Sequence, residues 1–480
     1  MEEVLKNAEE QVNADCETLS IITAGLDRLE GTWIDTRKLV HARSRGYFTP
    51  DEDDAVRQML LSYRNYRIAL YEIIRRCITY RSISDPALQI RLFMVGFAAG
   101  LTLYSKSLRL IQSYEREPLI REKLNEPEEK FGLGEGFFEE VLAAYSSPRN
   151  YWLLVRGSVF WRTHRRTAKR LRLLENEQGK WLAEIIRRQR KVIPAQLFKV
   201  LAQRARYDLR LFWNTTLNPL RRTTYALKSA LGTAFAGARV TLKYQPAITT
   251  EILRDLRQKL QPGDILFVRA DEKLTATLLP GFWSHAAIYL GSREELEQCG
   301  IGSDLVARFE EETAEETGNG FVIEAVSPRL GINPLEKSLF GDHVLALRPN
   351  LPLELIGVAL REAFAHLNKP YDFEFNFNIT NRIVCTELVY RSFHKKGGIE
   401  FTLVKRLGRF TLTGNDIVHY ALDGLKKPQP PLSPLALVLK RAKRGVFVPE
   451  ESIVSALEQI RSGVLPEKLD LKVSPALERT

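Results

Sequence analysis

Three short stretches in the second half of the chain decide the fold: WSHAAIYLG at 283–291, FVIEA at 321–325 and VCTELVY at 384–390. The first two have the apolar and β-branched content of buried strands, and the third begins a helical pattern. Each places one reactive side chain near the edge of its element, namely His285, Glu324 and Cys385. A thiol, an imidazole and a carboxylate can serve as a nucleophile, its base and the group that orients the base.

The sequence around these stretches predicts an α+β domain over residues 241–425. Strands are expected at 264–269, 284–290, 320–326 and 343–348, and helices at 352–367 and 382–396. The QPGD run at 261–264 is a turn signal just before the first strand. The acidic stretch 310–320 is expected to be a surface loop that joins two strands.

Residues 1–240 are expected to form a large all-α domain. Helical periodicity is present at 56–83, 134–145 and 177–191, and long runs contain few Gly or Pro residues, as in a helix bundle. The uncharged segment 92–104 lies between Arg91 and Lys106. It is shorter than the roughly 20 apolar residues that a transmembrane helix needs, so a buried core helix is expected.

The C-terminal part, 426–480, is expected to be separate from both domains. Prolines concentrate at 428–434, which is typical of a linker. A short tail follows, with basic residues at 440–444 and one predicted helix at 450–461.

Composition sets the broad class of the protein. The chain has 480 residues, of which 44% are hydrophobic and 27% charged, which indicates a globular protein of two or three domains. The four cysteines are far apart, which argues against a disulfide framework or a zinc site. The acidic N-terminus has no apolar run, so no secretory signal is expected. These features predict a cytoplasmic protein, and no cofactor or metal is expected.

Positive charge is concentrated at 156–222, which holds 18 Lys and Arg and 4 Asp and Glu, although the whole chain carries only +11. Apolar residues recur at helical spacing in this segment, and aromatic residues are interleaved with the basic ones. One interpretation is a solvated helix face. The other is a surface for an anionic partner, which could be phospholipid headgroups, nucleic acid or an acidic protein, and the aromatic residues suit a membrane interface better than a nucleic-acid module. No specific nucleic-acid motif is present, and the oligomeric state is not predicted.

Five motifs together resemble a known family, the YiiX/YebB-like permuted papain-type cysteine hydrolases. They are LQPGDILF at 260–267, SHAAIYLG at 284–291, VIEA at 322–325, PYDF at 370–373 and CTELV at 385–389. Such proteins are related to the NlpC-type cell-wall peptidases and to lecithin–retinol acyltransferase. The resemblance covers about a third of the chain and does not extend to residues 1–240. It implies a circularly permuted papain-like fold, in which the catalytic order is His, acid and then Cys, with His285, Glu324 and Cys385 at the site.

The residues themselves fit this chemistry. Cys385 is expected at the start of a helix capped by Thr380 or Asn381, where the helix dipole and an imidazolium favour a thiolate. His285 is the expected general base. Glu324 is the preferred residue to orient His285, because a carboxylate inside an apolar strand needs a partner. His343 is the alternative for this role.

Other residues near the motifs are candidates for weaker roles. Trp283, Ser284, Tyr371 and Asp372 are expected to contact substrate, whereas Asp264 and Glu387 are expected to be structural. The predicted function is a cysteine hydrolase of the amidase, peptidase or acyl-ester type that acts through an acyl-enzyme. The alternatives are a lipid acyltransferase or deacylase at a membrane surface, and a non-catalytic binding module with a helical interaction platform.

Overall fold

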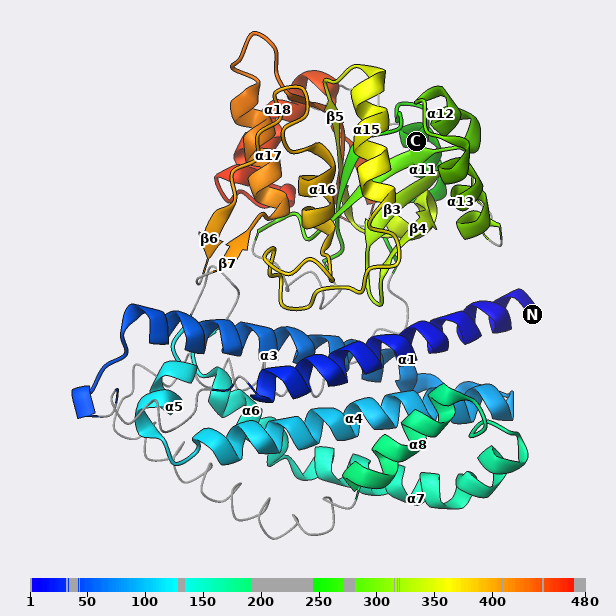
Figure 1. The fold of residues 1–480 in the computed structure, drawn as a ribbon, viewed down its shortest axis with the longest axis vertical. Coiled ribbons are helices and arrows are strands. Elements are labelled where there is room, and N and C mark those ends of the chain that lie inside the picture. Colours follow the sequence, from blue (N-terminus) through cyan, green and yellow to red (C-terminus); the bar gives the residue numbers. More distant parts are fainter. Residues whose placement is uncertain are drawn as a thin grey trace. The chain divides into compact units, whose positions relative to one another are not determined.

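The computed structural model divides into two compact units, Met1–Leu242 and Lys243–Thr480. The first is called the helical unit and the second the C-terminal unit (Figure 1). The structure describes residues 2–31, 44–127, 134–190, 245–271, 281–314, 320–406, 409–442 and 444–469, and single residues at 33, 42, 316 and 318. Part of the basic segment expected to bind an anionic partner, 191–222, lies outside these residues.

Helices make up the described part of the helical unit, and their bounds follow. They are α1 (Glu2–Gly31), α3 (Pro50–Cys77), the 3₁₀ helix η1 (Ile78–Ser82), α4 (Pro86–Tyr114), α5 (Pro118–Leu124), α6 (Phe137–Tyr145), α7 (Pro148–Arg170) and α8 (Glu177–Gln189). The expected all-α character of this part of the chain is confirmed.

Three long helices of this unit start with the same chemistry. Thr49, Asp85 and Ser147 are the N-cap residues of α3, α4 and α7, and each side chain accepts a hydrogen bond from a backbone N–H of the first turn. Each is followed by a proline at the first helical position, where the missing N–H costs nothing. Short polar sequences therefore fix where these helices begin.

Helix α4 is central to the helical unit and contacts α1, α3, α6, α7 and α8. Among the described helices it is long and apolar enough to cross a membrane, by length and composition alone. Its most apolar window is 67% buried within the structure. This burial fits the core helix expected from the sequence, because the apolar residues of the window pack against the neighbouring helices of the bundle.

The C-terminal unit is α+β, and its elements are as follows. The strands are β1 (Ile265–Arg269), β2 (His285–Gly291), β3 (Phe321–Ala325), β4 (Leu330–Pro334), β5 (His343–Pro349), β6 (Val404–Arg406), β7 (Arg409–Thr411), β8 (Leu432–Arg441) and β9 (Arg444–Phe447). The helices are α11 (Thr250–Arg257), α12 (Arg293–Gln298), α13 (Ser303–Thr313), α14 (Leu335–Ser338), α15 (Leu353–Phe364), α16 (Cys385–Phe393), α17 (Gly414–Gly424) and α18 (Ile453–Arg461), with the 3₁₀ helices η7 (Glu450–Ser452) and η8 (Pro466–Lys468).

Seven strands form one antiparallel sheet in the order β4-β3-β2-β1-β5-β8-β9, and β6 pairs with β7 separately. One face of the sheet packs on α11 through a cluster of buried residues that includes Leu256, Leu266 and Ala346. Helices α15 and α16 pack on each other and lie in front of the sheet in Figure 1. Because strands in the middle of the sheet are covered on both faces, they are apolar throughout rather than alternating.

A tight turn at residues 261–264 leads the chain directly into strand β1. The backbone N–H of Asp264 donates to the carbonyl of Gln261, and Gly263 between them has φ +93°. A positive φ at the third residue of the turn, directly after Pro262, is the requirement of a type II turn and favours glycine. Asp264 also binds Arg348 through two hydrogen bonds of 2.9 and 2.7 Å, so this acid is structural here.

The structure corrects two expectations. Residues 426–480 are not a separate linker and tail, because β8 pairs with β5 inside the sheet and begins within the proline-rich run. Pro434 is accommodated where the register between β5 and β8 shifts, at the irregular position that suits proline in a sheet. The acidic stretch is also not all loop, since residues 310–313 complete helix α13.

Candidate active site

The three candidate catalytic residues come from adjacent elements of the C-terminal unit. His285 is the first residue of β2, Glu324 lies in β3, and Cys385 is the first residue of α16. Ala287 pairs directly with Glu324, so His285, two residues earlier on the same face, is its diagonal neighbour across the strand pair. Helix α16 packs against both β2 and β3.

The Glu324 carboxylate is nearly fully buried and is fully engaged. Its Oε2 lies 2.6 Å from Nε2 of His285 and accepts a 2.7 Å hydrogen bond from the Ser338 hydroxyl. Its Oε1 accepts a 3.0 Å hydrogen bond from Nδ2 of Asn333. Burial works to raise the pKa of Glu324, but the hydrogen bonds and the charge of His285 outweigh it and lower the pKa. The group is therefore held as a carboxylate.

His285 lies between this carboxylate and the thiol. Burial works to lower its pKa, but hydrogen bonds with the Cys385 and Glu324 side chains and the charges of both raise the pKa to about 10. Because Nε2 faces Glu324, the other ring nitrogen, Nδ1, is left for the sulfur. The His285 side chain keeps 22% of its surface exposed, compared with 4% for Glu324, so the imidazole is the more accessible of the two.

Cys385 opens α16, but the helix begins differently from the sequence expectation. The N-cap residue is Val384, which makes no side-chain cap hydrogen bond, so neither Thr380 nor Asn381 caps the helix. Polar cap candidates four or five residues upstream are too far away to reach the first turn. The first-turn N–H groups have no acceptor within the helix and carry its partial positive charge. The Cys385 residue itself is only 1% exposed.

His343, the rival for the third role, occupies a different place. It lies in β5, and β1 separates that strand from β2. Its Nε2 is 3.3 Å from Oδ2 of Asp271, and its Nδ1 accepts a 3.2 Å hydrogen bond from the backbone N–H of Lys440. Both ring nitrogens are thus engaged with groups other than His285.

The four weaker candidates divide into two pairs. Trp283 is 1% exposed and packs on Phe267, and the Asp372 carboxylate accepts backbone N–H groups of Glu374 and Asn376. Both side chains therefore have packing or hydrogen-bonding roles in the fold, and their contact with substrate stays a prediction.

Ser284 and Tyr371 remain near the site. Ser284 donates to the carbonyl of Val268 at 3.3 Å and directly precedes His285. Tyr371 is partly buried, and burial together with the charge of the nearby Cys385 raises its pKa well above the usual range. A neutral phenol is therefore available beside the sulfur.

Sequence reasoning missed Asn333 and Ser338, the two other partners of Glu324. Asn333 pairs with Val322 in the β3–β4 register, which places it diagonal to Glu324 on one face of the sheet. The LGINP run that forms β4 was not predicted as a strand because it contains Gly and Pro. An edge strand, however, tolerates both residues. Prediction of a strand at 330–334, paired with the strand that carries Glu324, would have identified Asn333 as a candidate partner of Glu324.

The environment of Cys385 differs from that of the other three cysteines. All four are free and buried. Burial raises the pKa of Cys16 to about 11 and of Cys77 to about 12, and it also raises the pKa of Cys299. The Cys385 side chain, in contrast, forms a hydrogen bond with the His285 side chain. Within the described ranges, no group of three or more His, Cys, Asp or Glu side chains is arranged to hold a metal ion.

The antiparallel sheet, the cysteine at a helix start and the chain order of His, acid and Cys define a permuted papain-like domain. Residues 259–469 match the model of a family described as permuted papain-like amidase enzyme, YaeF/YiiX, C92 family. The C-terminal unit is therefore a papain-like hydrolase domain of the amidase type.

One solved structure is similar to the chain, described as the metalloprotein yiiX from Escherichia coli O157:H7. The identity is 18%, the TM-score is 0.23, and the match covers 40% of this chain and 98% of that one. No curated protein matches the chain.

Proposed function

We propose that the C-terminal unit is a cysteine-dependent hydrolase that cleaves an amide or ester bond through an acyl-enzyme. The main support for this proposal is the position of the His285 ring. Oε2 of Glu324 lies 2.6 Å from Nε2 on one side of the ring, and the Cys385 side chain lies on the other side. This is the arrangement of nucleophile, base and orienting group that such chemistry needs.

In the first half of the reaction, His285 takes the proton of the Cys385 thiol, and the sulfur attacks the substrate carbonyl. A bond forms between sulfur and carbon, and the carbonyl electrons move onto oxygen. The first-turn N–H groups of α16 are suited to hold this oxyanion. When the tetrahedral intermediate collapses, the bond from carbon to the leaving nitrogen or oxygen breaks, and His285 supplies the proton that the leaving group takes.

In the second half, water attacks the thioester while His285 removes a proton from it. The carbon–sulfur bond breaks, which releases a carboxylic acid and restores Cys385. An amine or alcohol in place of water would give acyl transfer by the same steps. The raised pKa of His285 favours the imidazolium, which stabilises negative charge on the sulfur and is ready to act as the acid.

A substrate panel tests the proposal. The full chain is assayed against matched short-chain amides, thioesters and phospholipid esters, with Cys385→Ala and Cys299→Ala as variant and control. Cys299 is buried and does not belong to the candidate set, so its variant should retain turnover. Turnover that survives in Cys385→Ala contradicts the proposal. No turnover of any substrate by the wild type would favour the alternative of a non-catalytic binding module.

We also propose that the basic face of the helical unit binds an anionic membrane surface. Helix α7 exposes Trp152, Leu153 and Val159 along with basic residues in its second half. Exposed apolar side chains beside cations on one helix are typical of interfacial binding. Vesicles with phosphatidylserine should retain the chain in flotation at low salt, and neutral vesicles should retain less.

The matched variant replaces Trp152 and Leu153 by Ser, because both side chains are more than half exposed and their loss leaves the core intact. Retention on anionic vesicles should fall in this variant. Equal retention on both vesicle types would contradict the membrane proposal.

A further inference from the structure

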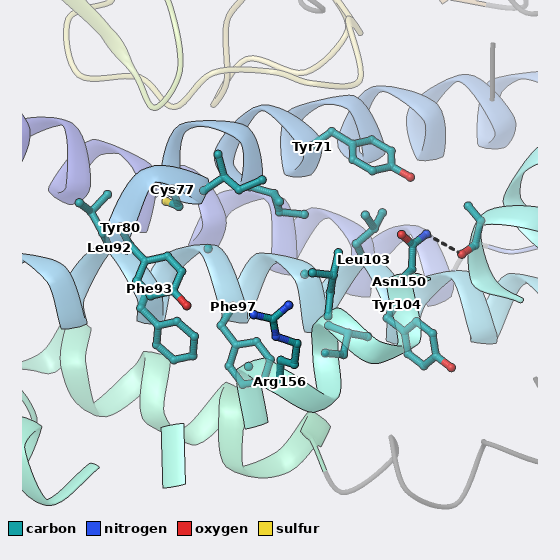
Figure 2. Close-up of a pocket in the computed structure, with 18 of the residues that line it drawn as sticks. Tyr71, Cys77, Tyr80, Leu92, Phe93, Phe97, Leu103, Tyr104, Asn150 and Arg156 are labelled. Carbon is teal, nitrogen blue, oxygen red and sulfur yellow. Dashed lines mark hydrogen bonds between the residues drawn. The ribbon is translucent and has the colours of Figure 1, made fainter. Parts of the chain in front are cut away.

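The helical unit contains a cavity of about 410 Å³ between α3, α4 and α7, far in sequence from the candidate active site (Figure 2). This volume lies within the range of small-molecule binding sites. The residues that line it come from α3, η1, α4, α6 and the first half of α7.

The cavity is elongated and has two different ends. In Figure 2, Tyr80, Leu92 and Phe93 lie at one end, and Tyr71 and Asn150 lie at the other. Tyr104 lies eleven positions after Phe93 on α4, which corresponds to about 16 Å along a helix. The first end is mainly aromatic and aliphatic, since the Phe93 ring contacts Tyr80 at 5.3 Å and Phe97 at 5.2 Å between centroids. Arg81 also lines the cavity, and its guanidinium lies over the Tyr80 ring.

Arg67 supplies a buried cation to the wall of the polar end. The residue is 4% exposed and lines the cavity. Its Nη1 donates to the Ser107 hydroxyl and its Nη2 to the Tyr71 hydroxyl, both at 2.9 Å, and its Nε is buried with no acceptor. The Tyr63 side chain is a further hydrogen-bond partner, and all three partners are hydroxyl groups rather than carboxylates.

The charge of Arg67 lacks a direct counter-ion. Among the residues that the structure describes, no carboxylate lies within ion-pair distance of its guanidinium, and Glu140 acts on it only from farther away. A buried charge is costly unless a charge of opposite sign pairs with it. The free Nε–H next to a terminal N–H is the fork that binds a carboxylate with two parallel hydrogen bonds.

We propose that this cavity binds a single-chain fatty carboxylate, with the head group on Arg67 and the hydrocarbon chain extended toward Tyr80 and Phe93. The ligand class follows from the elongated arrangement of the lining residues, from the mainly apolar far end, and from the buried Arg67 cation at the near end, which has no carboxylate partner among the described residues. Two further arginines, Arg81 and Arg156, also line the cavity and add positive charge to it. The site is independent of the chemistry proposed for Cys385.

Equilibrium dialysis of the full chain with radiolabelled palmitate tests the proposal, and hexadecanol serves as the neutral ligand of equal chain length. Wild-type protein should bind one palmitate per chain, at least tenfold more tightly than hexadecanol. Arg67→Met should lose this preference without loss of hexadecanol binding. Arg109→Met, an exposed arginine of α4, is the charge control and should bind as the wild type does.

A second variant fills the cavity without changing its charge. A Cβ added at Gly100 would meet only Leu154, at 3.6 Å, so Gly100→Leu places its side chain in the space without a backbone clash. This variant should weaken both ligands at least tenfold, and it keeps the proposal testable if Arg67→Met does not fold. Absence of saturable palmitate binding by the wild type would overturn the proposal. Unchanged palmitate binding in a folded Gly100→Leu variant would also overturn it.

Discussion

Nε2 of His285 and Oε2 of Glu324 lie 2.6 Å apart, and Ser338 and Asn333 hold the same carboxylate from two other directions. With three partners, the carboxylate has little freedom to turn, so the imidazole it faces is fixed as well. Orientation of His285 is thus a property of β2, β3, β4 and α14 together.

Glu324→Gln should lower kcat/KM and move the alkaline limb of the pH–rate profile to lower pH. The carboxylate contributes to the raised pKa of His285, about 10, so removal of its charge lets the imidazolium lose its proton earlier. A loss of roughly 10²- to 10⁴-fold is expected for a disabled acid–base group. Glu336→Gln, an exposed change on α14, is the control. An unmoved alkaline limb in Glu324→Gln would contradict this function of Glu324.

Ser338→Ala should reduce turnover by about tenfold and raise the pKa of Glu324, because one of the hydrogen bonds that favour the carboxylate is lost. The pKa is read from the acidic limb of the rate profile and from carboxyl NMR titration. Ser455→Ala, on the exposed side of α18, should change neither quantity. A rate loss in Ser338→Ala without any pKa change would mean that the hydroxyl acts elsewhere.

The free energy of unfolding should fall as pH rises from 6.5 to about 10, and His285 should account for part of the fall. Its folded pKa lies above its unfolded value of 6.5, so its stabilising contribution is fully present below pH 6.5 and is lost as pH rises through the folded pKa. Urea denaturation at several pH values measures the slope. His285→Gln should flatten it, and an equal slope in both proteins would refute the assignment.

Glu387→Gln should gain stability relative to the wild type as pH rises from 4.5 to 7. Burial raises the pKa of Glu387 to about 7 despite its ion pair with Arg391, so folding favours the protonated acid. The unfolded chain releases that proton near pH 4.5, so wild-type stability falls across this window, by about 3 kcal/mol at most. Thermal melts of both proteins at pH 4.5 and 7.5 measure the difference, which should be absent at the lower pH.

Much of the C-terminal fold was predictable from local pattern. The strands at His285, Glu324 and His343 and the helix at Cys385 are apolar runs bounded by turn signals, and their observed bounds lie within a few residues of those expected. The permuted papain-like fold was correctly predicted from five ordered motifs.

Features that depend on distant partners were not predictable in this way. Strand β8 begins in a proline-rich run, and only its pairing with β5 makes it a strand. Asn333 and Ser338 reach Glu324 through the sheet register and a short helix, neither of which leaves a periodic signal. The cavity beside Arg67 arises where three helices of the helical unit meet, which no single helix pattern encodes.

The most direct test of the central claim is intact-protein mass spectrometry after rapid mixing with an activated ester, followed by peptide mapping of the adduct. We expect one acyl group per chain, mapped to Cys385, present in the Cys299→Ala variant and absent in Cys385→Ala. An adduct of equal yield in Cys385→Ala, or one that maps to another residue in the wild type, would contradict it.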